Sequence, residues 1–288
     1  MDLGEYLKNV QIMTLSNNGP VIACPVTVNY IEMAYNFIEN LKKFSLDKNI
    51  YFQCLDEQVY KELSCVVYCE KKTDIIKKVK NRGDWIEAEK YSKIPLVRYL
   101  LGTFKRDLLL SDIDIFYFKN PLPLFYKYRE DYDIVSSSDK PYFPFNMIRK
   151  RDRIVTCVPL PKDYGITDQK KYGYMNGAVA LYKYQEKIIQ KFDEIFTLEL
   201  LKSYPKRKEA GAAQTIYNTN IQRTGLTVKK LSVFEIANGS LLKVDYLKKK
   251  VLEEATALHY NFFDPDPYIG YKQKIENMRS NEHWLINK

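Results

Sequence analysis

The sequence predicts an α/β domain in which helices flank a mostly parallel central sheet. Two observations lead to this prediction. Apolar runs of strand length alternate along the chain with segments whose apolar residues recur at helical spacing. No linker rich in Pro, Gly or Ser, no repeat and no low-complexity tract divides the 288 residues. Because strand–helix–strand units of this kind form parallel sheets, we expect one domain.

The first predicted unit lies near the start of the chain. Val21 to Val28 is a continuous apolar run, broken only by Pro25 and Thr27, and it is typical of a buried strand. Asn29 and Glu32 have the spacing of a capping box, which predicts that a helix opens there. The apolar positions of this helix are Ile31, Ala34, Ile38 and Leu41.

The next unit repeats the alternation. Ile50 to Leu55 predicts a second buried strand, which ends at Asp56. A short helix to Leu63 and a further strand at Cys65 to Tyr68 follow. Three alternating elements of this length favour neighbouring parallel strands.

The later elements follow the same pattern. Tyr91 to Leu101 suits a helix, in which Pro95 is tolerated only in the first turn. Leu108 to Phe116 is an apolar, strand-like run. A further strand and two helices are predicted at Ala178–Tyr182, Gln185–Leu201 and Ala210–Asn218. Pro141 to Pro161 shows no clear period.

Charge and composition limit the function without naming it. Lys and Arg number 45, and Asp and Glu number 36, which gives a formal net charge of +9. A basic surface attracts anions such as phosphates, nucleic acids or acidic membranes. Hydrophobic residues at 45% and charged residues at 28% exclude a disordered tail, a collagen and a disulfide miniprotein.

The cysteines and the start of the chain bear on its location. The five cysteines do not complete the spacing of a zinc site, and most lie in apolar stretches, which favours reduced core thiols. Asp2 and Glu5 stand where a signal peptide has basic residues, and no apolar run approaches the length of a membrane span. We therefore expect no transmembrane segment and a cytoplasmic location.

The most informative motif is a pair of carboxylates, Asp112 and Asp114, near the end of the apolar run Leu108 to Phe116. Side chains two apart on an extended chain point the same way, so the two carboxylates project together. Two adjacent anions repel each other, and their hard oxygen atoms suit Mg2+ or Mn2+ at the carboxyl end of a sheet. A solvated turn with two surface aspartates is the alternative.

The residues from Ser111 to Pro121 resemble the DxD block of the nucleotide-diphospho-sugar transferases, glycosyltransferase family seventy-seven and its relatives. Further blocks follow the order of that family, and the resemblance spans about residues 21 to 285. These blocks are Thr27–Asn29, Cys54–Glu57, Lys93–Leu101, Met175–Gly177, and Leu258–Asn261 with Gly270, Lys274 and Trp284.

The resemblance implies a GT-A type fold, which is a single Rossmann-like domain over residues 1–288. Within it, residues from about 21 to 130 would bind the nucleotide. Residues from about 131 to 288 would bind the acceptor and complete the metal and diphosphate site. It implies a retaining glycosyltransferase that moves a sugar from a nucleotide-sugar donor, most often a UDP-sugar, to a glycan, protein or other hydroxyl acceptor. Asp112 and Asp114 would hold Mn2+ or Mg2+ against the diphosphate, and His259 would be the third ligand. A satisfied core histidine is the alternative for His259.

The resemblance also implies a donor-binding set and one further catalytic residue, Gln214. Beside Gln214 the family has an acid where this chain has Ala213; Glu209 is a possible substitute by reach. The donor-binding set is Thr27, Val28, Asn29, Asp56, Lys93, Arg98, Ser111, Ile113, Asn176, Gly177, Gly270, Lys272 and Lys274. Simpler roles remain open for several of these residues: helix caps for Asn29 and Asp56, a solvated helix face for Lys93 and Arg98, and a tight turn at Asn176 and Gly177.

Two other functions compete with the glycosyltransferase. A phosphatase of the haloacid dehalogenase type also uses an apolar strand ending in DxD, but it needs a later acidic motif, for which only Asp264 and Asp266 are available. A nucleic-acid-binding protein would use basic runs such as Lys248 to Lys250, which lack aromatic residues at a recognisable spacing. We expect no nucleic acid as a partner.

Overall fold

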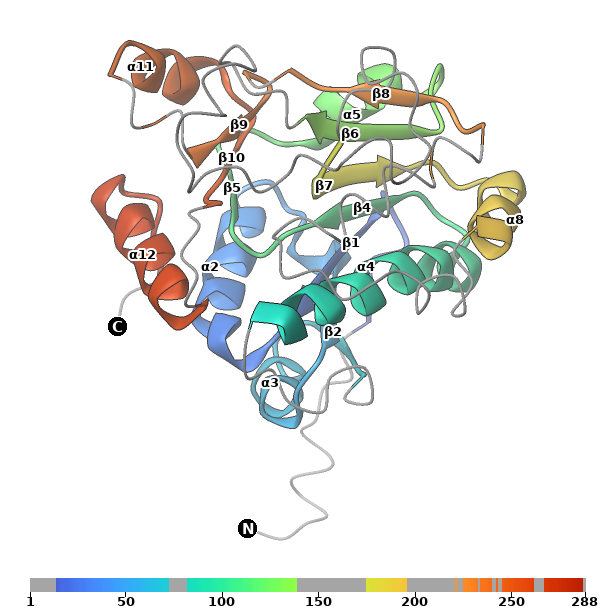
Figure 1. The fold of residues 1–288 in the computed structure, drawn as a ribbon, viewed down its shortest axis with the longest axis horizontal. Coiled ribbons are helices and arrows are strands. Elements are labelled where there is room, and N and C mark those ends of the chain that lie inside the picture. The colour runs from blue at the N-terminus through green and yellow to red at the C-terminus, as the bar shows by residue number, and fades with distance from the viewer. Residues whose placement is uncertain are drawn as a thin grey trace, which may run out of the picture.

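The computed structural model describes residues 14–72, 82–138, 175–195, 221, 225–232, 234–239, 242, 245–261 and 267–286. In these residues, two sheets and the helices around them form an α/β architecture (Figure 1). The helix predicted at Ala210–Asn218 and the segment Pro141–Pro161 lie outside the described residues.

The larger sheet has seven strands in the order β3-β2-β1-β4-β7-β6-β8. Their bounds are β1 (Val21–Val26), β2 (Ile50–Cys54), β3 (Tyr68–Lys71), β4 (Leu108–Ser111), β6 (Ile134–Ser138), β7 (Met175–Tyr182) and β8 (Val228–Lys230). β7 runs antiparallel to β4 and β6, and the other pairings, β1–β2, β2–β3, β1–β4 and β6–β8, are parallel. The predicted mostly parallel sheet is confirmed.

A smaller sheet has the strand order β5-β10-β9, with β5 (Ile115–Tyr117), β9 (Ile236–Asn238) and β10 (Ala257–His259). β10 is antiparallel to β5 and parallel to β9. Because β5 follows β4 after a single short turn, this sheet lies at the carboxyl end of β4 and brings a late part of the chain, β10, to that edge (Figure 1).

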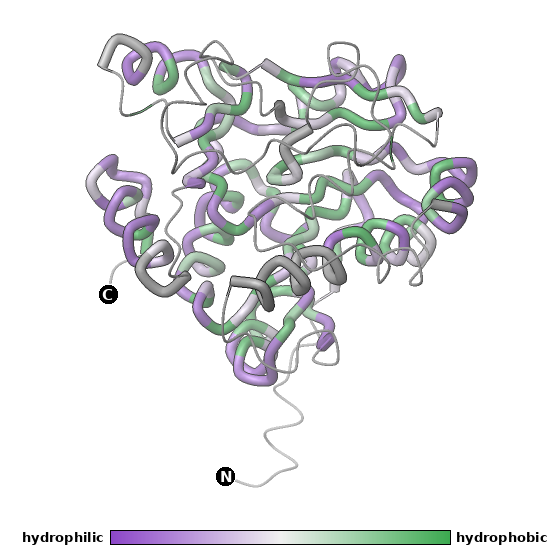
Figure 2. The backbone as a smooth tube through the Cα atoms, viewed as in Figure 1, coloured by the Kyte–Doolittle hydropathy of each residue, from purple (hydrophilic) through white to green (hydrophobic). Residues whose placement is uncertain are grey.

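Helices cover both faces of the larger sheet. They are α2 (Ile31–Lys42), α3 (Glu57–Leu63), α4 (Arg82–Phe104), α5 (Leu122–Arg129) and α8 (Glu186–Ile195). Two later helices, α11 (Asp245–Glu254) and α12 (Pro267–Ser280), contribute Val251 and Met278 to the core of the smaller sheet. Alternate residues of β1 divide the core: Ile22 and Cys24 belong to the cluster with α2, α3 and α5, and Val21 and Ala23 belong to the cluster with α4 and α8. The strands are accordingly hydrophobic along most of their length, whereas α12 is mostly hydrophilic (Figure 2).

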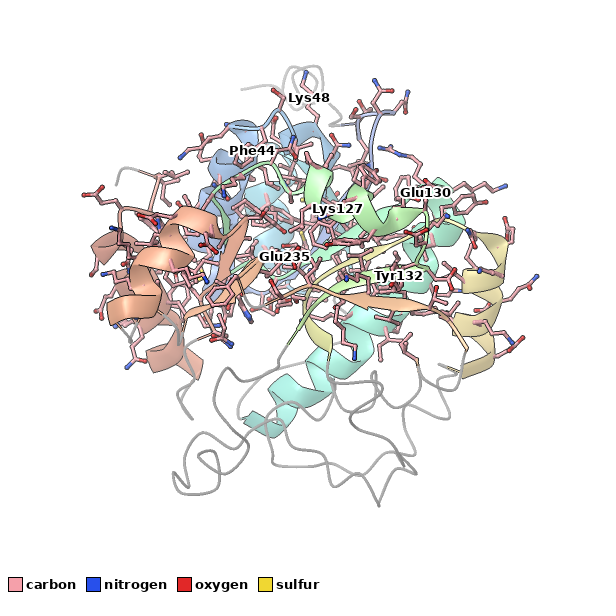
Figure 3. All side chains as sticks on the ribbon, turned by 90° about the horizontal axis from the view of Figure 1, so that it is seen from above. Phe44, Lys48, Lys127, Glu130, Tyr132 and Glu235 are labelled. Atoms are coloured by element: carbon pink, nitrogen blue, oxygen red, sulfur yellow. The ribbon has the colours of Figure 1, made fainter. Side chains whose placement is uncertain are left out.

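The surface around α5 is polar. Seen from above, Lys127, Glu130 and Tyr132 lie along α5 and the turn that follows it (Figure 3). Glu130 accepts a hydrogen bond from Arg129 Nη1 at 2.8 Å, and Lys183 Nζ lies 3.6 Å from its other carboxylate oxygen. Glu130 itself is exposed, and ion pairs with an exposed carboxylate contribute little to stability.

The capping box predicted at Asn29 is wrong. Tyr30 N donates a hydrogen bond to Thr27 O at 2.9 Å, which closes a short 3-10 helix, η1 (Val28–Tyr30), around Asn29. A second short 3-10 helix, η2 (Asp47–Asn49), precedes β2. The helix α2 begins only at Ile31, so Asn29 lies inside η1 and is not the cap.

Two further boundaries differ from the prediction. β3 starts at Tyr68, because Val66 N and Val67 N still donate to Leu63 O at the end of α3. α4 extends from Arg82 to Phe104, so Pro95 lies in the helix interior rather than in its first turn. Pro95 is exposed there, and its ring removes the N–H that would donate to the carbonyl four residues earlier.

Candidate active site

The acidic turn, Asp112–Asp114, connects the two sheets. β4 ends at Ser111 and β5 begins at Ile115, so the strand predicted over Leu108–Phe116 is in fact two strands in different sheets. Asp112 N donates to Ala178 O of β7 at 2.6 Å, and Tyr260 N donates to Asp114 O at 2.9 Å. Each aspartate backbone is therefore tied to a neighbouring part of the fold.

The side chains of Asp112, Asp114 and His259 converge. His259 Nε2 lies 3.4 Å from Asp114 Oδ1 and 3.9 Å from Asp112 Oδ2, and the ligating atoms of all three residues lie within 4.8 Å of one another. Asp114 is 4% exposed and His259 8%, while the Asp112 side chain is 22% exposed. A solvated turn with surface aspartates is thus the wrong description, because one carboxylate is buried.

Two lysines contact the carboxylates from opposite sides. Lys93 Nζ of α4 lies 2.6 Å from Asp112 Oδ1, and Lys274 Nζ of α12 donates to Asp114 Oδ2 at 2.5 Å. Burial acts to raise the pKa of Asp114, but Lys274 and His259 outweigh it and hold this pKa well below its usual value. Burial and the neighbouring Asp114 raise the pKa of Asp112 against the opposing effect of Lys93.

The residues present fit a divalent ion. Two carboxylate oxygens and one imidazole nitrogen are ligands that Mn2+ accepts, and the carboxylates also suit Mg2+. His259 Nδ1 is buried and has no hydrogen-bond partner among the described residues, so His259 is not the satisfied core histidine of the alternative prediction. If Nε2 were to ligate the ion, Nδ1 would be the nitrogen that carries the proton.

The loop after β1 lies on the same edge of the sheet. Val28 N donates to Asp56 Oδ2 at 2.8 Å, which joins the carboxyl ends of the parallel neighbours β1 and β2. Thr27 is buried, and its Oγ1 has no hydrogen-bond partner within the described part of the chain. Buried hydroxyls are seldom left unpaired, so the Thr27 hydroxyl is an exception at this edge of the sheet. Asn29 is half-buried in the same loop.

The helix α12 closes this edge from the other side. The rings of Tyr30 in η1 and Tyr271 in α12 make an edge-to-face contact with centroids 5.6 Å apart. Lys274 Nζ lies 5.6 Å from the centre of the Tyr30 ring. Gly270 is buried in α12, whereas Lys272 is exposed. Lys274 therefore links the loop after β1 to the acidic turn.

Sequence reasoning missed Tyr117, Asn36 and Asn40, which hold the acidic turn in place, and it named Ser111 only for donor binding. The hydroxyls of Ser111 and Tyr117 lie 2.9 Å apart and close the segment that carries both aspartates. Asn40 of α2 exchanges two hydrogen bonds with the Tyr117 backbone, and Asn36, one helical turn earlier, bonds to His283 O and Leu285 N. The only available signal was two amides four residues apart on an apolar helix face. Ile113 is buried within the turn.

Four predicted site residues remain: Arg98 lies away from the acidic turn, Asn176 and Gly177 lie in β7, and Gln214 is not described. Arg98 binds Asp193 of α8, with Nε donating to Oδ1 at 2.6 Å, and it does not contact the acidic turn. Gly177 lies in β7 next to Ala178, which accepts the bond from Asp112 N; the Asn176 backbone lies there too. Gln214 lies outside the described residues, as do Ala213 and Glu209.

An α/β sheet with a carboxylate pair and a histidine at its carboxyl edge has the architecture of a GT-A glycosyltransferase. The chain belongs to the nucleotide-diphospho-sugar transferase family, whose model matches residues 45–278. It is therefore a glycosyltransferase of the nucleotide-diphospho-sugar type rather than a phosphatase of the haloacid dehalogenase type. A comparison with curated proteins gives no match.

Solved structures support the fold at low sequence identity. The chain is similar to the galactosyltransferase LgtC in complex with donor and acceptor sugar analogues, with a TM-score of 0.53, 14% identity, and 90% of this chain and 95% of LgtC covered. It is also similar to a glycosyltransferase involved in the glycosylation of the major capsid of PBCV-1, with a TM-score of 0.51, 10% identity, and coverage of 90% and 100%. The bifunctional glycosyltransferase WbbM matches with a TM-score of 0.54 and 12% identity over 93% of this chain but 52% of its own.

Among the residues that the structure describes, no helix has the length and apolar character needed to cross a membrane.

Proposed function

We propose that this glycosyltransferase uses a UDP-sugar as its donor and depends on Mn2+ or Mg2+ held by Asp112, Asp114 and His259. The observation that carries the proposal is the convergence of these three side chains within 4.8 Å at the carboxyl edge of the sheet. That edge is where open α/β sheets bind nucleotides. A bound divalent ion would offset the negative charge that develops on the departing diphosphate.

The residues near the proposed metal site would contact different parts of the donor. Asp56 is fixed by Val28 N through one oxygen, and its second oxygen is available to accept a hydrogen bond from the base or the ribose. Thr27 Oγ1 offers an unpaired buried hydroxyl beside it. Lys93 and Lys274 bring two ammonium groups to the acidic turn, where they are able to donate to phosphate oxygens.

The acceptor and the stereochemistry follow from the family resemblance. We propose that a hydroxyl of a glycan, a protein or another acceptor attacks the sugar, with the residues after about 130 forming most of the acceptor side. We also propose that the reaction retains the configuration at the anomeric carbon, with Gln214 near that carbon. NMR of the linkage in the product tests this directly, and an inverted linkage would exclude retention.

A thermal-shift experiment tests the donor and the metal together. UDP with Mn2+ should raise the melting temperature of the full chain, because a ligand at 100 times its Kd stabilises the folded state by about 2.7 kcal/mol. Asp114→Ala should abolish this rise, whereas Asp131→Ala, which removes an exposed carboxylate after α5, should keep it. An equal rise in both variants, or a rise with GDP and none with UDP, would contradict the proposal.

A further inference from the structure

We propose that Lys93 and Lys274 set the metal affinity of the acidic turn and make tight metal binding depend on a bound diphosphate. This inference rests on the proposed function, because it concerns the same ion and the same donor. It goes further in assigning the two lysines to the carboxylates themselves, and in predicting that removal of either lysine strengthens metal binding.

The first observation is that the carboxylate oxygens are divided between lysine and histidine. Lys93 contacts Asp112 Oδ1 and Lys274 contacts Asp114 Oδ2, while His259 Nε2 faces the other oxygen of each carboxylate, Asp112 Oδ2 and Asp114 Oδ1. Each ammonium group thus fixes one oxygen and leaves its partner turned toward the histidine. Hydrogen-bond partners of this kind orient carboxylate ligands.

The second observation is the balance of charge. The two ammonium groups formally cancel the two carboxylates, and all four side chains are largely shielded from water: the exposed fractions are 17% for Lys93 and 22% for Asp112, and 14% for Lys274 and 6% for Asp114. Shielded charges are screened less than surface charges. A divalent cation alone therefore meets a centre of almost no net charge.

A diphosphate changes this balance. Its negative charge restores the attraction for the cation, and its oxygens accept hydrogen bonds from the same ammonium groups. Lys274 is suited to this exchange because it lies between the acidic turn and Tyr30 in the loop after β1, where we place the nucleotide. Metal and nucleotide should consequently bind more tightly together than either does alone.

The test measures Mn2+ binding to the full chain by the loss of the electron paramagnetic resonance signal of free Mn2+. Lys93→Met and Lys274→Met keep the apolar stem of lysine and remove its charge. Each variant should bind Mn2+ without nucleotide at least about tenfold more tightly than the wild type, because an opposing charge at this range is removed. The further increase in Mn2+ affinity on adding UDP should be smaller in each variant than in the wild type. The association of Mn2+ with UDP alone is measured separately in buffer, so that it can be subtracted.

Two controls separate charge from shape. Lys93→Arg and Lys274→Arg keep the charge, so their affinity for Mn2+ alone should stay within about threefold of the wild type. Lys191→Met removes a lysine whose partner is Glu194 of the same helix, at 2.7 Å and away from the site, and it should leave Mn2+ affinity unchanged. Circular dichroism checks that each variant folds. If Lys274→Met does not fold, Lys274→Gln is measured in its place.

The outcomes distinguish this inference from the proposed function. Equal or weaker binding of Mn2+ alone by both folded methionine variants would overturn the role of the lysines, as would tighter binding by the arginine variants. If instead wild type and Asp114→Ala bind no Mn2+ even with UDP, the proposed metal dependence itself fails. Binding by the wild type that Asp114→Ala loses, together with tightening in the methionine variants, supports both.

Discussion

The amide of Asn40 is predicted to be a main support of the segment that leaves the acidic turn. Asn40 is 0% exposed. Its Nδ2 donates to Tyr117 O at 2.9 Å, and Tyr117 N donates to its Oδ1 at 2.7 Å. Asn40→Ala leaves both backbone groups of Tyr117 buried without these partners. Since each such group costs about 1 to 3 kcal/mol, the free energy of unfolding should fall by about 2 to 6 kcal/mol.

Urea denaturation, followed by both far-UV circular dichroism and tryptophan fluorescence, measures this loss. The matched control is Asn277→Ala on α12, whose amide donates only to Gln273 O on an exposed face, and its effect should stay under about 0.5 kcal/mol. A loss below about 1 kcal/mol in Asn40→Ala would refute the reasoning, because the two bonds would then not be needed to satisfy the Tyr117 backbone.

Two further predictions concern stability. Burial, aided by Lys43, lowers the pKa of His283 to about 4, whereas the unfolded chain takes up this proton near pH 6.5. The unfolded state therefore binds more protons between these values, so up to about 3 kcal/mol of stability, fully present above pH 6.5, should be lost as the pH falls to 4. Urea denaturation at a series of pH values measures the free energy of unfolding, and in His283→Gln it should change less between pH 4 and 6.5. The same slope in the variant and the wild type would contradict the role of His283. Arg98→Ala should lower the melting temperature only slightly, by the equivalent of less than about 1 kcal/mol, because its pair with Asp193 is half exposed; a loss of several kcal/mol would show that Arg98 has a structural role.

The apolar patterns predicted most of the sheet. β1 and β2 were predicted with their approximate bounds because their residues are buried on both faces and form continuous apolar runs. The boundary errors have local causes that composition does not reveal. Asn29 has the side chain of a cap, but the backbone closes a 3-10 turn one residue earlier. Pro95 breaks the helical pattern in the sequence. The helix α4 nevertheless continues past Pro95, because it packs Ile94, Leu96 and Val97 into the core.

In the acidic turn, too, the local pattern was predicted from the sequence and the tertiary arrangement was not. The sequence spacing predicted that Asp112 and Asp114 project together, and they do converge on His259, but through a turn between two sheets rather than along one extended strand. Alternation along a strand depends only on neighbouring residues. The pairing of β5 with β10 depends on residues far along the chain, and no local pattern contains it.

The basic residues were the hardest to assign. Lys93 and Arg98 lie on the same helix five positions apart, and nothing in the sequence distinguishes them. The structure separates them by their partners, since Lys93 meets Asp112 and Arg98 meets Asp193. The identity of a charged partner across the fold is tertiary information.

The most direct measurement of the proposed metal-dependent mechanism is anomalous X-ray diffraction at the manganese edge from crystals soaked with Mn2+ and UDP. A single strong peak should lie between Asp112, Asp114 and His259, with the diphosphate of UDP beside it and the base next to Thr27 and Asp56. Nucleotide bound at that edge of the sheet with no manganese peak among the three side chains would contradict the mechanism.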